Sequence, residues 1–192
     1  LVNKVSDLPA IMDKAFFIAQ KGRPGPVLVD VPINLQYTYC ESAKYRKFNF
    51  RWKKPICSRS VIREIAKKIA ISKRPLILAG GGVILSSASE ELTTLLQDYQ
   101  LPVAQTLMGL TSVESGYGLN LGFVGYAGSR ISNLALKHAD FILGLGLRFD
   151  NRAFPAGNKD ICPSAYIVHV DCDKNEFNHR IIANKTVLAD VK

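Results

Sequence analysis

A run of three glycines is the first group of residues in this 192-residue chain whose type and spacing suit ligand binding. Gly80, Gly81 and Gly82 follow an apolar run and lead towards a helical segment. Glycine backbone lets a ligand approach closely, and amides near a helix start attract anions. The spacing is not GxGxxG and no acidic residue ends the next strand, so an ordinary NAD site is not indicated. A tight structural turn explains the triplet equally well.

An arginine pair is the second group. Arg148 and Arg152 flank Asp150, and Gly146 precedes them at the end of another apolar run. Arginine side chains bind phosphate through two parallel hydrogen bonds, and Asp150 is placed to orient one of them. The alternative is a cluster of surface ion pairs, which would carry no function.

An acidic residue ends a third apolar run. Asp171 is placed where a carboxylate accepts hydrogen bonds from ribose hydroxyls in nucleotide-binding sheets. Capping of a following helical turn by Asp171 or Asp173 explains the same residues equally well. Together the glycines, the arginines and Asp171 predict a cleft for a dinucleotide or another ADP-containing nucleotide.

Catalytic and metal-binding patterns are absent from the sequence. His169 lies inside an apolar run and is expected to be a satisfied core residue rather than a base. The four cysteines are scattered without a CxxC pair, which predicts free thiols, a reducing cytoplasmic location and no metal site. The longest apolar stretch, 75–85, is too short to span a membrane, for which about 20 residues are needed. We therefore predict no catalytic residue and no metal ligand in this chain.

The net charge of +9 has a local origin. Residues 41–74 contain twelve Lys or Arg and two Glu, so they carry +10, and the rest of the chain carries −1. We expect these basic residues to form a solvated charged face, because neither an aromatic platform nor a helix-turn-helix pattern accompanies them. Nucleic-acid or anionic-surface binding is the alternative.

The periodicity of apolar residues predicts three parts. A helix over 8–19 that ends at Gly22 and a buried strand over 26–32 cannot enclose a core, so residues 1–36 are expected to be the end of another domain. Residues 37–55 are polar and basic without a sustained period and are expected to be a linker. Residues 56–192 are expected to form one domain.

The third part alternates helix and strand patterns. Helices are predicted from about 58 to 70 and over 89–99 and 129–138, and strands over 75–79, 101–105, 141–145, 166–170 and 187–189. Continuous apolar strands that alternate with helices are typical of a parallel sheet covered on both faces. We therefore predict an α/β fold with a doubly wound parallel sheet.

Several of these motifs resemble those of thiamine-diphosphate-dependent enzymes. GRPGPV over 22–27 is similar to the end of their pyrimidine-binding domain. The glycine triplet, TLMG over 106–109, LGF over 121–123 and GLRFD over 146–150 are similar to their Rossmann-like (DHS-like) central domain, with the acetolactate synthase catalytic subunit as the nearest match.

The resemblance implies a fragment of an enzyme that acts on 2-oxo acids such as pyruvate. Thiamine diphosphate and Mg²⁺ would bind to parts of the parent enzyme outside this chain, so the chain alone would be inactive. The partners would be the remaining domains of the parent, in a homodimer or homotetramer, without nucleic acid or membrane.

The resemblance also implies that this central domain binds FAD for structure more than for redox chemistry. The implied cofactor-binding residues are Arg23, Gly80, Gly81, Gly82, Thr106, Leu107, Met108, Leu121, Gly122, Gly146, Arg148, Asp150, Arg152, Asp171 and Asp190. Two departures from the family pattern, Phe123-Val124 and Asn151, also suit relatives that bind ADP or nothing at this site. A nucleotide-free structural spacer is therefore the alternative.

Overall fold

A computed structural model describes residues 1–40, 49–154 and 161–192. The chain divides into two compact units, Leu1–Lys53 and Lys54–Lys192, and the boundary falls within the predicted linker.

The first unit contains a helix but no strand among its described residues. A 3₁₀ turn, η1 (Val5–Asp7), leads into α1 (Leu8–Gln20), and α2 (Ile33–Gln36) is a single turn. Gly22, with φ +60°, follows the predicted helix in a left-handed conformation that suits glycine. The strand prediction for 26–32 is wrong. Its backbone bonds to the rest of the unit are those from Val2 N to Asp30 O and from the amides of Leu35 and Gln36 in α2 to Pro32 O, none of them a strand ladder, and Leu28 is 91% exposed. A strand needs a neighbouring strand, and the described part of this unit offers none.

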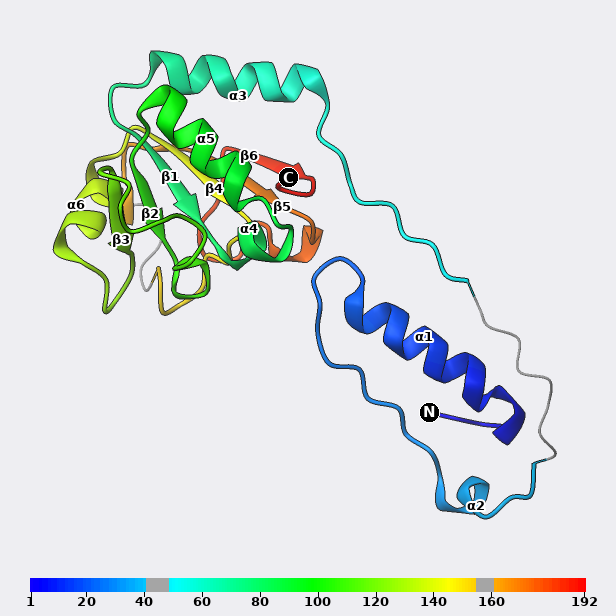
Figure 1. Cartoon of the computed structure of the whole chain (residues 1–192). Coiled ribbons are helices and arrows are strands. Elements are labelled where there is room, and N and C mark those ends of the chain that lie inside the picture. The colour runs from blue at the N-terminus through cyan, green and yellow to red at the C-terminus, as the bar shows by residue number, and fades with distance from the viewer. Residues whose placement is uncertain (41–48, 155–160) are drawn as a thin grey trace. The chain divides into compact units, whose positions relative to one another are not determined.

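The second unit is built on a six-stranded sheet in which all strands are parallel (Figure 1). The order is β3-β2-β1-β4-β5-β6, the arrangement of doubly wound dinucleotide-binding folds. The strands are β1 (Pro75–Ala79), β2 (Val103–Gln105), β3 (Asn120–Phe123), β4 (Phe141–Leu145), β5 (Tyr166–Asp171) and β6 (Lys185–Leu188). The predicted fold class is confirmed.

Helices cover the sheet and carry clear start signals. The longer helices are α3 (Arg59–Ile71), α5 (Ser89–Tyr99) and α6 (Arg130–His138), and the short elements are α4 (Gly81–Leu85), η2 (Leu107–Gly109) and η3 (Lys174–Glu176). Ser58 accepts a hydrogen bond from Val61 N at the start of α3, and Ser129 accepts one from Ser132 N at the start of α6. Such caps satisfy backbone donors that a helix cannot pair internally.

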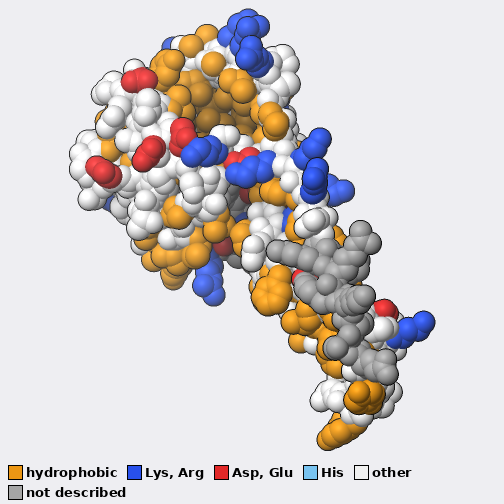
Figure 2. Space-filling model, turned by 45° about the vertical axis from the view of Figure 1, so that its right-hand side comes forward, with side chains coloured by type: hydrophobic (Ala, Val, Ile, Leu, Met, Phe, Trp, Pro, Cys, Tyr) orange, Lys and Arg blue, Asp and Glu red, His pale blue; other side chains and the backbone are white. Residues whose placement is uncertain are grey.

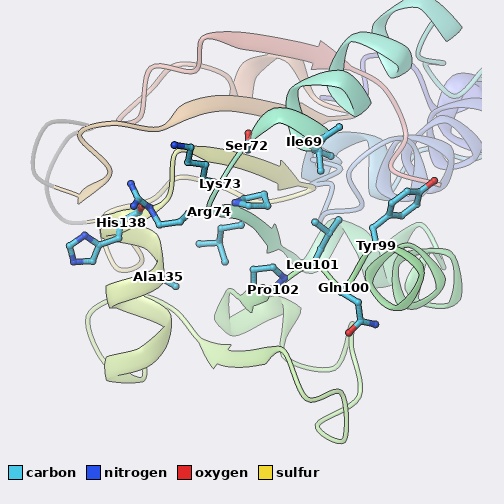
Figure 3. A pocket seen from close by; sticks show the side chains of 13 residues that line it. Ile69, Ser72, Lys73, Arg74, Tyr99, Gln100, Leu101, Pro102, Ala135 and His138 are labelled. Atoms are coloured by element: carbon cyan, nitrogen blue, oxygen red, sulfur yellow. The ribbon is translucent and has the colours of Figure 1, made fainter.

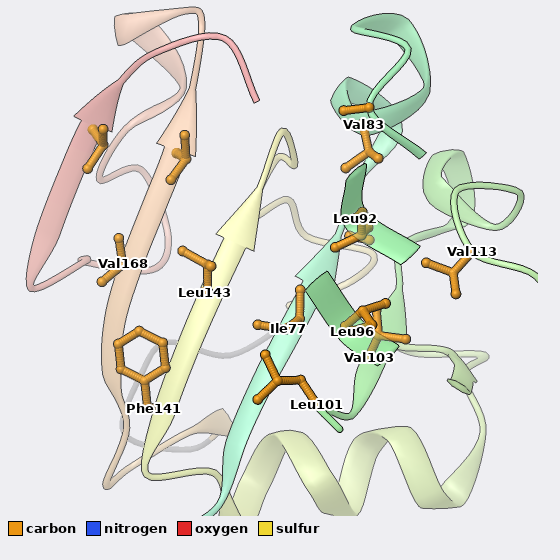
Figure 4. Close-up of a cluster of buried hydrophobic side chains, with 14 of the residues drawn as sticks. Ile77, Val83, Leu92, Leu96, Leu101, Val103, Val113, Phe141, Leu143 and Val168 are labelled. Carbon is orange, nitrogen blue, oxygen red and sulfur yellow. The ribbon is translucent and has the colours of Figure 1, made fainter. Parts of the chain in front are cut away.

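Two apolar cores lie on opposite faces of the sheet because successive strand side chains alternate. Ile77 of β1 belongs to the core that includes Leu92 and Leu96 of α5 and Leu143 of β4 (Figure 4). Its neighbours on the strand, Leu76 and Leu78, belong to the other core, with Ile142, Leu136 of α6 and Phe154. Burial of β1 on both faces explains its continuous apolar sequence.

β3 and α4 are among the elements that were not predicted from the sequence. β3 is a four-residue edge strand that contains Gly122, and its pairing with β2 shifts register between Val103 and Gln105. α4 begins within the glycine triplet, at Gly81, where the sequence suggested either a ligand-approach loop or a tight turn. Both have little apolar periodicity of their own, so tertiary contacts determine their conformation.

Most basic residues of α3 lie on its exposed side, whereas Lys68 is half-buried with its Nζ 4.4 Å from the centroid of the Tyr166 ring. Arg59, Arg63 and Lys67 are exposed, whereas Ile65 packs against the core. On the molecular face in Figure 2, Lys and Arg side chains form separate groups with acidic and apolar side chains between them. No helix in the described ranges has the length and apolar character that crossing a bilayer requires.

Candidate functional site

The strand order reverses direction between β1 and β4, the two central strands of the sheet. Connections from β1 run to one side of the sheet through β2 and β3, whereas β4, β5 and β6 extend to the other side. The loops after β1 and β4 therefore diverge at a topological switch point, where open α/β sheets bind ligands. Gly80–Gly82 follow β1, and Gly146 with Arg148 follows β4.

The two glycine loops touch backbone to backbone. Gly82 N donates to Gly146 O at 2.8 Å, and Gly80 N donates to Leu145 O at 2.9 Å. A Cβ on Gly80 would lie 2.3 Å from Gly146 O, and a Cβ on Gly82 would lie 2.6 Å from the Cα of Gly146. Close packing therefore requires glycine at these positions. Among the three amides of the triplet, only that of Gly81 lacks a protein acceptor in the described part of the chain.

The loop after β2 adjoins the same glycines. Thr106 N donates to Ala79 O at 2.9 Å, and a Cβ on Gly81 would lie 3.1 Å from the Cβ of Met108. The side chains of Leu107 and Met108 are 59% and 75% exposed. An exposed apolar surface thus stands beside the free amide of Gly81.

Leu121 and Gly122 lie farther along the sheet, in the edge strand β3. Ser129 Oγ, which caps α6, also donates to Leu121 O at 2.9 Å. Gly122 has φ +79°, and no atom would obstruct a Cβ there within 4 Å. The helix cap therefore fixes the position of β3.

Arg148 is engaged by an acid that sequence analysis did not single out. Its Nε lies 3.0 Å from Oε2 of Glu176 in η3, while the Arg148 side chain is 58% exposed. The sequence suggested that Asp150 orients an arginine side chain, and the described part of the structure does not show this contact. Asp150 Oδ1 instead accepts backbone hydrogen bonds from Arg152 N and Ala153 N, which closes a turn. The Arg152 guanidinium is exposed and has no partner in the described ranges.

A buried histidine supports the Arg148 loop. His169 in β5 is fully buried, and its Nε2 donates to Leu147 O at 2.9 Å. Burial lowers the pKa of His169, although the hydrogen bond to Leu147 and the charge of Glu176 act in the opposite direction. The imidazole is therefore neutral near pH 7. The apolar run around His169 predicted a satisfied core residue. Its burial confirms the core position, but its Nδ1 has no hydrogen-bond partner in the described part of the chain, and no sequence pattern linked it to Arg148.

Acidic residues follow β5 and β6. Asp171 Oδ1 accepts from Asp173 N at 2.8 Å, and Asp173 Oδ1 accepts from Asn175 N and caps η3, as the capping explanation requires. Asp190 forms an ion pair of 2.9 Å with Lys54. Burial is the main reason that the pKa of the Cys172 thiol is raised, and the negative charges of these acids raise it further. The remaining predicted residue, Arg23, belongs to the first unit.

A cavity lies at the opposite edge of the sheet. A pocket of about 590 Å³ is lined by the ends of α3, α5 and α6, including Tyr99 and His138, and by Arg74 (Figure 3). Arg74 Nε donates to His138 O at 2.7 Å, so this cation compensates the carbonyl end of α6. No group of three or more candidate metal ligands occurs among the described residues.

Comparisons with known proteins show the family of this chain. Residues 62–192 match the thiamine pyrophosphate enzyme central domain family. The chain is 38% identical over its whole length to the acetolactate synthase isozyme 1 large subunit of Escherichia coli and 34% identical to the acetolactate synthase large subunit of Buchnera aphidicola from Acyrthosiphon pisum. It spans 34% of the length of each of these curated relatives.

A solved structure shows the same fold. It belongs to a Mycobacterium smegmatis protein assigned to the thiamin diphosphate-dependent enzymes, with a TM-score of 0.80 and 17% identity. The match covers 99% of this chain and 36% of the other. The chain belongs to the thiamine pyrophosphate enzymes and contains the central domain of an acetolactate synthase-like protein.

Proposed function

We propose that the second unit binds FAD, or another ADP-containing nucleotide, at the carboxyl edge of its sheet. The observation that carries the proposal is the meeting of two loops at the switch point. One loop offers the free amide of Gly81, and the other offers the cation Arg148 two residues beyond Gly146. Amides and arginines at a switch point of this kind suit a diphosphate group.

The other predicted residues suit the remaining parts of a dinucleotide. Leu107 and Met108 offer exposed apolar surface for a flavin ring, beside Thr106 and the edge-strand residues Leu121 and Gly122. Asp171 and Asp190, at the ends of β5 and β6, would approach the adenosine. Arg152 supplies a second cation.

We further propose that the parent protein is a thiamine-diphosphate-dependent carboligase of the acetolactate synthase type, which joins 2-oxo acids such as pyruvate. The names of the relatives support this assignment. Thiamine diphosphate and Mg²⁺ would bind outside this chain, in a cytoplasmic homodimer or homotetramer. The chain alone would then bind a nucleotide and space the catalytic domains without activity.

The test is a fluorescence titration of FAD with the purified chain, with ADP as competitor. We expect saturable flavin binding, and Arg148→Ala should weaken it by about tenfold or more through loss of a charge-assisted contact. Lys137→Ala removes the same charge at the end of α6, on the opposite edge of the sheet, and is the matched control. Equal losses in the two variants would contradict the proposed site. ADP binding without FAD binding would identify a non-flavin relative.

A nucleotide-free spacer is the second candidate, because two observations explain the motif residues without a ligand. Gly80, Gly82 and Gly146 are needed for loop packing, and Arg148 already has Glu176 as a partner. If neither FAD nor ADP binds to the chain or to its longer parent protein, the spacer function is the correct one.

A further inference from the structure

His169 lies next to the point where the backbone hydrogen bonds between β4 and β5 end. This ladder pairs the strands up to Leu145 and Val170, and Gly146 N makes the last bond, to Val170 O at 2.9 Å. From Leu147 onward the chain leaves β5. The His169 side chain then supplies the donor for Leu147 O that the neighbouring backbone no longer provides.

The same ring fixes elements on both sides of it. The Phe149 ring packs edge-on against His169 at 4.9 Å between centroids, and the Phe177 ring does so at 5.0 Å, both at 85°. Phe149 follows Arg148 in the chain, and Phe177 follows Glu176. His169 therefore holds the residue next to each member of the Arg148–Glu176 ion pair.

A purely apolar core does not need a histidine here. His169 is fully buried, and its Nδ1 has no hydrogen-bond partner in the described part of the chain. An unpaired buried polar atom is destabilising, and a phenylalanine would fill a similar volume without it. The gain from histidine is the hydrogen bond to Leu147 O, one residue before Arg148.

We propose that His169 is a positioning residue for anion binding, which holds the Leu147 carbonyl and so sets the direction in which Arg148 leaves the β4 loop. The inference rests on the proposed nucleotide site. His169 does not contact the nucleotide itself and acts through Arg148.

The test compares two replacements in the full chain. His169→Phe keeps an aromatic ring between Phe149 and Phe177 but cannot donate. His169→Gln places an amide N–H near the position of Nε2. We expect His169→Phe to weaken ADP binding, measured by calorimetry, by about tenfold, and His169→Gln to keep it within about threefold. His138→Phe, an exposed site at the opposite edge, is the control and should leave affinity unchanged.

A double-mutant cycle separates positioning from a general structural role. In an Arg148→Ala background, His169→Phe should cause no further loss of ADP affinity, because the residue through which it acts is gone. Equal losses with and without Arg148, or no loss in wild type, would overturn the proposal.

A second readout needs no nucleotide. The Nε–H resonance of Arg148 reports its ion pair with Glu176 in a proton–nitrogen NMR spectrum. We expect His169→Phe to shift this resonance and speed its exchange with water, and His169→Gln to preserve it. If wild type binds no nucleotide, the proposed function fails. An unchanged Arg148 resonance in His169→Phe would instead refute the positioning role.

Discussion

The backbones of Gly82 and Gly146 are in direct contact across the switch point of the sheet. Gly82 N donates to Gly146 O at 2.8 Å, and a Cβ on either glycine would lie 2.6 Å from the Cα of the other. Gly146 also has φ +56°, which strains any other residue. The loops after β1 and β4 are thus held together by contacts that side chains would prevent.

Gly82→Ala should destabilise the protein, because the new methyl group meets backbone that cannot move aside. We expect a loss of about 1–3 kcal/mol in the free energy of unfolding, measured by urea denaturation. Gly118→Ala is the matched control, since Gly118 is exposed and a Cβ there would meet no atom within 4 Å. That control should be neutral or slightly stabilising. A stable Gly82→Ala protein would mean that the loops separate easily.

The stability of the protein should depend on pH through His169. Burial lowers the pKa of His169 in the folded state, whereas the unfolded chain has an ordinary histidine pKa of about 6.5. On acidification through this value the unfolded state binds a proton first. Stability is therefore fully present above about pH 6.5 and is lost at up to ~1.4 kcal/mol per pH unit below it.

His169→Phe removes this proton uptake and should flatten the corresponding part of the stability profile. The measurement is the urea midpoint of wild type and variant between about pH 7 and pH 5, a range set by the ordinary histidine pKa. The difference between the two profiles isolates His169 from other titrating groups. Parallel profiles would show that the folded state protonates His169 as readily as the unfolded chain does.

Ser129→Ala should cost more stability than Ser58→Ala. Ser129 Oγ accepts from Ser132 N at 3.0 Å and donates to Leu121 O at 2.9 Å, so it joins α6 to β3. Ser58 Oγ caps α3 through a longer, exposed contact of 3.4 Å with Val61 N. We expect a loss of about 1–2 kcal/mol for Ser129→Ala and about 0.5 kcal/mol for Ser58→Ala in thermal or urea unfolding. The opposite order would show that the bond to β3 adds nothing.

Cys162 should be unreactive in the folded protein. Burial raises the pKa of its thiol to about 11, so almost no thiolate exists at pH 8. Labelling with a chromogenic disulfide reagent should modify exposed Cys40 rapidly and Cys162 only after denaturation. The site of modification is read by peptide mass spectrometry. Equal labelling of both thiols in the folded protein would show that the core around Cys162 opens readily.

The sequence predicted the elements that are buried by strong apolar patterns. β1, β4 and α5 have the predicted boundaries, because a continuous apolar run or a helical stripe leaves one favourable burial arrangement. The segment 26–32 has the same kind of pattern and forms no strand in the described unit. An apolar pattern shows that a segment can form a strand, but the strand also needs a neighbouring strand, which the segment's own sequence does not specify.

The sequence by itself determined the residue types at the carboxyl edge: glycines where backbones meet, arginines after β4 and acids after β5 and β6. Only the tertiary structure decided how these residues are used. Asp150 closes a turn, Arg148 pairs with Glu176 from η3, and His169 holds the carbonyl before Arg148. The physical reason is that hydrogen bonds and ion pairs join residues distant in sequence, whereas periodicity reports only which face of an element is buried.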